Sequence, residues 1–177
     1  SPLSSGKIEM KYMTAKEEDI LTNQNYIERG VVIDKLLQAL IVNKEIDYND
    51  LLIGDKNALL IAARVLGYGK DYEFNYGDTK EIIDLTLLKE KDFDSKAFKK
   101  GKNEFTYTLP TTGVELTYKL LTHGDEAKIQ RELTGLRKIN KEASPDLSTR
   151  LKYMITAVNG DGETKTIRDF VDNEFLA

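Results

Sequence analysis

The spacing of the hydrophobic residues changes near residue 71, and this change constrains the fold more than any other feature of the sequence. Before it, apolar side chains recur every three or four residues, which is the spacing that predicts helices. After it, apolar and polar side chains alternate in two pairs of short segments, which is typical of β-hairpins. We therefore expect an α+β protein with an N-terminal three-helix block, followed by antiparallel hairpins with flanking helices.

The first part of the chain, residues 1–70, is expected to form a strand and the helical block. Residues 8–12 alternate in polarity and predict the strand. Thr14 predicts the N-cap of the first helix, because Glu17 follows it at the spacing of a capping box. Amide side chains favour leaving helical geometry, so we expect this helix to end at about 23–25.

Two further helices are predicted within this block, over about 30–43 and 56–67. The later one is apolar around most of its circumference, so we expect it to be the most buried helix. Gly67 and Gly69 are suitable residues to end it. Arg64 interrupts its apolar surface, and a buried arginine needs a carboxylate partner. The candidate partners are the acidic residues of the first helix, Glu17, Glu18 and Asp19.

Residues 71–123 are expected to form two β-hairpins joined by an exposed loop. Turn residues separate the alternating segments of each hairpin. The loop, residues 89–103, is highly charged, and a short helix is expected within it at about 95–99. The predicted strands cover residues 72–76 and 83–87 in the first hairpin, and 105–109 and 114–120 in the second.

Residues 124–177 are expected to form a C-terminal helical region. Its first helix is predicted to begin at Gly124-Asp125 and to end at about residue 140. Residues 147–158 show both helical spacing and strand-like alternation, and we favour a helix there. Thr166 and Asp169 predict the start of a last short helix.

The composition argues against several classes of protein. The 26 basic and 30 acidic residues give a net charge of −4 that is spread along the chain, which argues against nucleic-acid binding and against an anionic membrane surface. Cysteine is absent, so disulfides, thiolate-bound metals and thiol catalysis are excluded. No apolar run reaches the ~20 residues that span a bilayer. The chain begins with Ser1 rather than methionine, which is compatible with a fragment.

The residues needed for catalysis are not gathered in any motif. His123 is the only histidine, and a histidine in a turn is a simpler interpretation of it than a general base. Glu17 and Glu18 are adjacent, so on a helix they do not face each other. The basic run 99–102 favours a solvated loop over phosphate binding, because the chain as a whole is acidic. We expect no catalytic, cofactor-binding or metal-binding residue, and no enzymatic activity.

Tyrosine is the residue type that most suggests a surface function. The chain has nine tyrosines and no tryptophan. Tyrosine is enriched at protein interfaces, although packing within half-buried strands explains these residues equally well. We expect contacts through the first helix, over 14–25, through the hairpin tyrosines and through the loop 89–103. The candidate interface residues are Lys16, Glu17, Asp19, Tyr68, Tyr72, Tyr76, Tyr107 and Tyr118, and structural roles are expected for Thr14, Arg64, Gly67 and Gly69.

One segment of the first third resembles the signature of a known family. Residues 12–23 have the sequence YMTAKEEDILTN. This segment resembles the signature of the baseplate hub proteins of T-even-type phages, which have contractile tails. The likeness spans most of the chain and is most specific in its first third. It continues through DLLIGDKN (50–57), RVLGYG (64–69), LPTTG (109–113), LLTHGDE (120–126) and AVNG (157–160).

The chain departs from the family in one respect. Members often carry a Cys-x-x-Cys zinc segment after the helix that corresponds to the one ending near Gly69. Here residues 72–78 contain no cysteine, so a zinc role carried over from the family is unsupported. We expect hydrophobic packing of the hairpin to replace the metal.

The resemblance implies a structural component of the central hub of a phage contractile-tail baseplate. Such a protein would contact other baseplate and tail proteins or copies of itself, without nucleic acid, membrane or metal. It would be assembled in the host cytoplasm and be located in the virion. The alternatives are a transient assembly chaperone that is not retained in the particle and, less favoured, a small enzyme.

Overall fold

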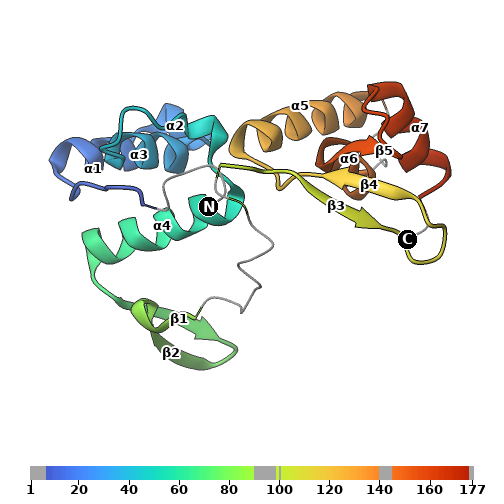
Figure 1. Cartoon of the computed structure of the whole chain (residues 1–177). Coiled ribbons are helices and arrows are strands. Elements are labelled where there is room, and N and C mark those ends of the chain that lie inside the picture. The colour runs from blue at the N-terminus through green and yellow to red at the C-terminus, as the bar shows by residue number, and fades with distance from the viewer. Residues whose placement is uncertain (1–6, 90–98, 100, 140–144, 176–177) are drawn as a thin grey trace.

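The computed structural model describes residues 7–89, 99, 101–139 and 145–175. The architecture is α+β, as expected, with N-terminal helices, antiparallel sheets of two and three strands, and flanking helices. Figure 1 shows two bodies side by side, with the two-stranded sheet set apart from both. We call residues 7–69 the N-terminal lobe and residues 101–175 the C-terminal lobe.

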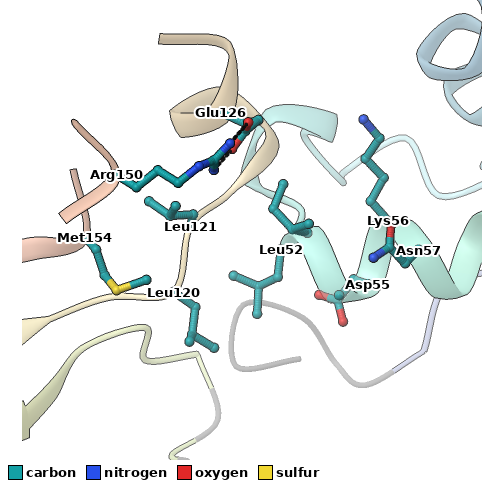
Figure 2. Close-up of a pocket in the computed structure, with 11 residues that line it drawn as sticks. Leu52, Asp55, Lys56, Asn57, Leu120, Leu121, Glu126, Arg150 and Met154 are labelled. Atoms are coloured by element: carbon teal, nitrogen blue, oxygen red, sulfur yellow. Dashed lines mark hydrogen bonds and ion pairs between the residues drawn. The ribbon is translucent and has the colours of Figure 1, made fainter. Parts of the chain in front are cut away.

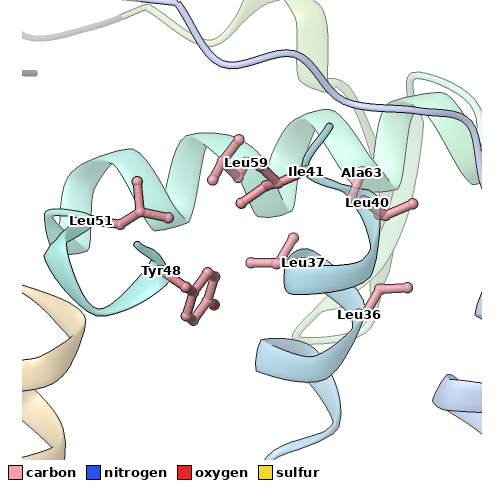
Figure 3. Packing of buried hydrophobic residues seen from close by; sticks show 8 residues of the cluster. All are labelled: Leu36, Leu37, Leu40, Ile41, Tyr48, Leu51, Leu59 and Ala63. Atoms are coloured by element: carbon pink, nitrogen blue, oxygen red, sulfur yellow. The ribbon is translucent and has the colours of Figure 1, made fainter. Parts of the chain in front are cut away.

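The N-terminal lobe packs short helices around one apolar cluster. Figure 3 shows this cluster, in which Leu37 and Leu40 are almost fully buried and face Leu59 and Ala63 of a longer helix. Burying one leucine-sized side chain contributes roughly 1.5–3 kcal/mol, so these contacts define the lobe. Its elements are α1 (Ala15–Leu21), α2 (Gln24–Glu28), α3 (Val32–Leu40), the 3-10 helix η1 (Tyr48–Asp50) and α4 (Ile53–Tyr68).

Helix α1 begins where the sequence predicts. Oε2 of Glu17 accepts hydrogen bonds from the backbone N–H of Thr14 at 3.0 Å and from its hydroxyl at 2.6 Å, as in a capping box. The helix ends at Leu21, earlier than predicted, because Asn23 caps a separate helix. Its Oδ1 accepts from the N–H of Tyr26 at 3.1 Å, and so α2 is an element that the sequence pattern does not predict.

The predicted strand at residues 8–12 is reduced to a single β-bridge between Met10 and Ile41. The N–H of Lys11 donates to the carbonyl of Leu40, and the N–H of Val42 donates to the carbonyl of Glu9, both at 2.9 Å. Pairing stops there because the partner segment is extended only briefly after α3. The same bridge ends α3 at Leu40, short of the predicted residue 43.

The prediction that α4 is the most buried helix is wrong. Of its residues, Leu59 and Ala63 are buried, whereas Leu60, Ile61 and Leu66 are 37 to 39% exposed. The helix lies at the edge of the lobe, and only the side that faces α3 packs against the core. The apolar residues on its other sides therefore stay exposed. Helix α3 holds the central position.

The first predicted hairpin forms from β1 (Asp71–Tyr76) and β2 (Thr79–Asp84). Gly77, with φ of 59°, begins a two-residue turn that places Tyr76 opposite Thr79. The second strand therefore begins four residues before the predicted 83. It ends where Asp84 caps the short 3-10 helix η2 (Leu85–Leu87), because its carboxylate accepts from the N–H of Thr86 at 2.9 Å.

The C-terminal lobe has its own core. Strands run in the antiparallel order β3-β4-β5, and Leu116 and Ile155 of this sheet pack with Phe170 and Val171 of the last helix. The second predicted hairpin is confirmed by β3 and β4. The elements are β3 (Phe105–Thr108), β4 (Glu115–Tyr118), α5 (His123–Ile139), α6 (Asp146–Met154), β5 (Ile155–Val158) and α7 (Thr164–Asn173).

Residues 147–158, which show both helical spacing and strand-like alternation, form a helix and then a strand. Helix α6 continues to Met154, and β5 begins at the next residue. The range predicted to be helical thus also contributes a strand. Helix α7 begins two residues before Thr166, whose hydroxyl donates to Asp161 at 2.8 Å instead of capping the helix. The predicted loop and its short helix lie largely outside the described residues.

A short pairing joins the two lobes. Leu52 forms a β-bridge with Thr122, and the N–H of His123 donates to the carbonyl of Leu51 at 2.8 Å. In the described ranges, no helix is long and apolar enough to cross a membrane.

Candidate interaction surface

One side of the hairpin β1–β2 is aromatic and open to solvent. Strand alternation places Tyr72, Phe74 and Tyr76 on this side, and the strand register places Ile83 beside Tyr72. Their exposed fractions range from 36% for Phe74 to 77% for Tyr76. The rings of Tyr72 and Phe74 stack with centroids 6.1 Å apart. We call these four residues the aromatic face.

The hairpin cannot cover the aromatic face by itself. All of β1 is exposed, and the other side of the sheet carries an exposed ion pair between Glu73 and Lys80. Leu87 and Leu88 follow the hairpin and are 73% and 53% exposed. The expectation that hydrophobic packing of the hairpin replaces a metal is therefore wrong. Two strands alone are marginally stable in water, so other contacts hold the hairpin in place.

Arg64 is the first of these contacts. Its Nη1 donates to the carbonyl of Gly69 at 2.8 Å, and its Nη2 donates to the carbonyl of Asp71 at 3.2 Å. The guanidinium also lies over the rings of Tyr68 and Tyr72, at 5.4 and 5.9 Å from their centroids. Arg64 therefore pairs with backbone carbonyls and rings rather than with the acids of α1, because it is only partly buried near the end of α4.

An ion pair closes the base of the hairpin. Nζ of Lys70 lies 2.6 Å from Asp84, and the N–H of Leu85 donates to the carbonyl of Lys70 at 2.9 Å. The hydrogen bond from Lys70, together with those from Thr86, lowers the pKa of Asp84 to about 2. The pair is therefore charged at neutral pH and fixes where β1 begins and where β2 ends.

Helix α1 meets the start of the hairpin through Tyr68. Its hydroxyl lies 3.0 and 3.1 Å from the two carboxylate oxygens of Glu18, and this hydrogen bond raises the pKa of Tyr68. Lys16 and Asp19 are exposed on the same helix. The structure thus brings part of the first candidate surface, α1, next to part of the second, the hairpin tyrosines.

Glu17 differs from its neighbours on α1 because its side chain points inward. It is 1% exposed, and Nζ of Lys11 lies 2.6 Å from its Oε1. This hydrogen bond, followed by those from Thr14, lowers the pKa of Glu17 to about 2. The structure therefore gives Glu17 a place in the capping box and in an ion pair whose lysine is half-exposed.

Tyr107 lies on β3 and Tyr118 on β4 of the C-terminal lobe. Figure 1 shows these strands away from the hairpin β1–β2. Tyr107 is 54% exposed on the edge strand β3. Tyr118 packs on Phe105, with ring centroids 5.5 Å apart. The candidate tyrosines therefore belong to two separate surfaces.

Three contributors to the hairpin surface are missing from the candidate interface residues: Glu18, Phe74 and Ile83. Phe74 stands between two of the candidate tyrosines in the alternating segment, so the strand pattern contains the signal for it. The register that brings Ile83 beside Tyr72, and the contact of Glu18 with Tyr68, depend on the tertiary structure.

His123 lies in a polar network at the joint between the lobes. Nζ of Lys56 is 2.5 Å from Asp34 and 3.3 Å from Nδ1 of His123, while the hydroxyl of Tyr48 donates to Asp34 at 2.9 Å. The ring of Tyr48 also contacts the imidazole edge to face, with centroids 4.7 Å apart. Burial lowers the pKa of His123, and Lys56 acts in the same direction.

This network holds elements together rather than presenting reactive groups. Burial alone would raise the pKa of Asp34, but its hydrogen bonds from Lys56 and Tyr48 keep that pKa below its ordinary value. Each charged group thus has a partner inside the network. Within the described residues, no three acidic or histidine side chains are grouped so that they could hold a metal ion.

Comparisons of the chain with models of protein families, with curated proteins and with solved structures give no match.

Proposed function

We propose that the protein is a structural component of the central hub of a phage contractile-tail baseplate and that it acts through protein–protein contacts. The observation that carries the mode of action is the aromatic face, whose side chains stay 36 to 77% exposed in the described part of the chain. Exposed apolar patches of this kind mark interaction sites, and aromatic residues dominate binding energy at interfaces. The assembly itself is proposed from the resemblance of residues 12–23 and the shorter segments downstream.

The segments that carry the resemblance meet one another in the fold. Residues 12–23 contact 64–69, where Tyr68 binds Glu18. Residues 50–57 contact 120–126, where the N–H of Ile53 donates to the carbonyl of Leu121 at 3.3 Å. The aromatic face lies outside these segments.

Mass spectrometry of purified phage particles tests the proposal. We expect the protein in intact particles at a fixed ratio to the known tail subunits. Recovery only from tail intermediates, with none in finished particles, would support the transient chaperone instead. Absence from both would overturn the proposal.

A matched pair of variants tests the contact surface. We expect the double substitution Tyr72→Ser and Phe74→Ser to lower incorporation into particles at least about tenfold, because hot-spot aromatics each contribute ~2 kcal/mol or more. Leu147→Ser is the control, since Leu147 is similarly exposed but lies on α6 and is not a candidate interface residue. Equal incorporation of the double variant and the wild type, with both folded by circular dichroism, would exclude the aromatic face as the contact.

A further inference from the structure

The pocket beside α4 has a volume of about 690 Å³ and lies between the first turn of that helix and the C-terminal lobe (Figure 2). Its aliphatic walls include Leu52, Leu120 and Met154. Nη1 and Nη2 of Arg150 lie 2.6 and 2.7 Å from the carboxylate oxygens of Glu126, so the guanidinium at one end is already paired. Walls of this kind do not select one ligand. The aromatic face is more selective, because it combines exposed rings with unpaired charges.

A carboxylate stands within the aromatic face. The strand register pairs Glu81 with Phe74, so both side chains lie on the same side of the hairpin. Glu81 is exposed and accepts a hydrogen bond from the hydroxyl of Thr79 at 3.1 Å. Lys80, which precedes it on β2, is held by Glu73 on the opposite side of the sheet. In the described ranges no basic side chain pairs with Glu81, so its negative charge is open to a partner.

A positive charge borders the same face. The guanidinium of Arg64 lies over the ring of Tyr72, 5.9 Å from its centroid. Two of its nitrogens donate to the carbonyls of Gly69 and Asp71. A guanidinium carries five N–H groups, so others remain for an acceptor from outside. Among the residues that the structure describes, no carboxylate forms an ion pair with Arg64. The aromatic face therefore has an unpaired acid inside it and an unpaired base at its border.

The size of this surface suits a small interface. A fully exposed side chain of this kind presents roughly 200 Å², so the exposed fractions of the aromatic face correspond to roughly 400 Å². The residues within and around it add to this area and bring it to roughly 700 Å² per copy. They are Arg64, Tyr68, Thr79 and Glu81. Two such surfaces would bury roughly 1,400 Å² together, which lies in the lower part of the range of specific protein interfaces.

We propose that two copies of the protein pair through their aromatic faces about a two-fold axis. The rings of one copy pack on the rings of the other, and Glu81 of each copy binds Arg64 of the other copy. A two-fold contact forms every interaction twice and closes on itself, so the assembly stops at the dimer. The inference rests on the proposed function in one respect, since it names a second copy as the partner of the surface assigned there.

Charge complementarity favours a second copy over other partners. A wholly apolar partner would cover Glu81 and Arg64 without pairing them, and burial of unpaired charges is costly. A basic partner would pair with Glu81 but repel Arg64, and an acidic partner would do the reverse. An anionic membrane surface would repel Glu81 in the same way. The aromatic face itself carries both charges, so a second copy matches both.

Sedimentation velocity of the full chain tests the pairing. The monomer has a mass of 20.1 kDa, and we expect a rise to twice that mass as the concentration increases. The small interface predicts a dissociation constant on the order of 10 µM, so concentrations from roughly 1 to 500 µM cover the transition. A chain that stays monomeric at the highest concentration would overturn the proposal. A mass that continues to grow beyond the dimer would overturn it too, because a two-fold contact closes.

A matched pair of charge reversals tests the location of the contact. We expect Glu81→Lys to weaken the dimer at least about tenfold, because it places a lysine against Arg64 of the other copy. Glu73→Lys is the control, since it makes the same change of charge on the opposite side of the same hairpin and loses only an exposed ion pair. Its dissociation constant should stay within about threefold of that of the wild type. Equal weakening by the two substitutions would overturn the proposal.

Phe74→Ser provides a second variant that does not change the charge. It should also weaken the dimer at least about tenfold, because aromatic residues dominate binding energy at interfaces. Circular dichroism of all three variants checks that the fold is intact. A dimer that tolerates both Glu81→Lys and Phe74→Ser would lie elsewhere on the molecule, and the proposal would fail.

This test and the particle test fail independently. Sedimentation uses the isolated chain, so a monomeric protein that is present in particles would refute the self-pairing alone and would leave another hub protein as the partner. A dimer that is absent from particles and from tail intermediates would refute the baseplate role alone.

Discussion

At the scale of single residues, the chain uses its charged side chains mainly to fix local structure. Glu17 illustrates this, because its carboxylate is buried yet receives hydrogen bonds from Lys11 and from Thr14. A buried charge is tolerated only when it is paired and hydrogen-bonded in this way. The capping box that the sequence predicts is therefore also an ion-pair site, and the sequence pattern does not reveal that second part.

We predict that Glu17→Gln lowers the melting temperature by roughly 5 °C at pH 7, because it removes the charge of a buried carboxylate that is paired with Lys11. The pKa of Glu17 is lowered from 4.5 to about 2, so its contribution is complete above pH 4.5 and is lost as the pH falls toward 2. The difference between variant and wild type should therefore shrink over this range. Calorimetry from pH 2 to 7 measures it.

Asp19→Asn is the control for this prediction, because Asp19 is exposed on the same helix. It should change the melting temperature by less than about 1 °C. A difference between Glu17→Gln and wild type that is independent of pH would show that the charge of Glu17 is not what stabilises α1.

At the scale of elements, Gly67 and Gly69 near the end of α4 have different conformations, although the sequence suggests the same role for both. Gly67 lies inside the helix, whereas Gly69 ends it with φ of 83° and ψ of 172°. That backbone region is essentially restricted to glycine. At Gly67, an added Cβ would lie 2.8 Å from Cε of Met13, which is the end of a flexible side chain.

We predict that Gly69→Ala lowers the free energy of unfolding by about 1–3 kcal/mol, because alanine is strained in this conformation. Gly67→Ala should change it by less than about 1 kcal/mol, since the helical preference of alanine offsets the displacement of Met13. Urea unfolding of both variants measures the contrast. Equal costs at the two positions would contradict the assignment of Gly69 as the residue that ends α4.

The attachment of the hairpin β1–β2 also belongs to this scale. We predict that Arg64→Leu speeds amide hydrogen exchange in β1 and β2 at least about tenfold, because the hydrogen bonds to Gly69 and Asp71 are lost. Exchange in α3, which lies in the N-terminal core, should change little. A uniform increase throughout the N-terminal lobe would mean that Arg64 supports the whole lobe rather than the hairpin.

The sequence predicts most elements of this fold because their signals are local. Thr14 with Glu17, the turn at Gly77 and the alternation around Tyr107 each act over a few residues. Helix α1 begins where expected and both hairpins form, although α1 is shorter than predicted and β2 begins four residues earlier. The aromatic face is likewise readable from Tyr72 and Tyr76. The signals that fail are those that depend on partners elsewhere in the chain.

Three examples show this dependence on tertiary partners. The apolar surface of α4 predicts burial, but only one side of the helix meets α3. Residues 147–158 carry two patterns, and strand β5 exists because β4 pairs with it. The pocket beside α4 is lined by residues 52–57 together with Leu120 and Met154, and the sequence does not show that these distant segments meet.

At the scale of the whole molecule, two cores are joined by a narrow contact. The clusters around Leu37 and Leu116 share no residue, and the lobes meet through the pairing of residues 51–53 with 121–123 and through the network at His123. This network contains residues from α3, η1, α4 and α5. Its protonation state therefore bears on how firmly the lobes are joined.

The direction of this effect follows from the pKa of His123. Burial and the nearby ammonium of Lys56 lower it from 6.5, and the opposing influence of Asp34 and Glu126 is smaller. In the unfolded chain the imidazole binds a proton at a higher pH than in the folded protein. The contribution of neutral His123 to stability is therefore complete above pH 6.5 and declines as the pH falls below it.

We predict that the free energy of unfolding of the wild type falls between pH 7 and pH 5.5, with a slope no steeper than about 1.4 kcal/mol per pH unit, the limit for one proton. His123→Phe keeps a ring against Tyr48 but cannot titrate, so its stability should be nearly constant over this range. His123 is the only histidine, and the pKa values of Asp34 and Glu126 are lowered, so these carboxylates stay ionised there. Urea unfolding at each pH measures both slopes. Equal slopes for the two proteins would show that His123 is not the residue that makes the joint between the lobes sensitive to pH. A rise in wild-type stability toward pH 5.5 would contradict the predicted direction of the pH dependence.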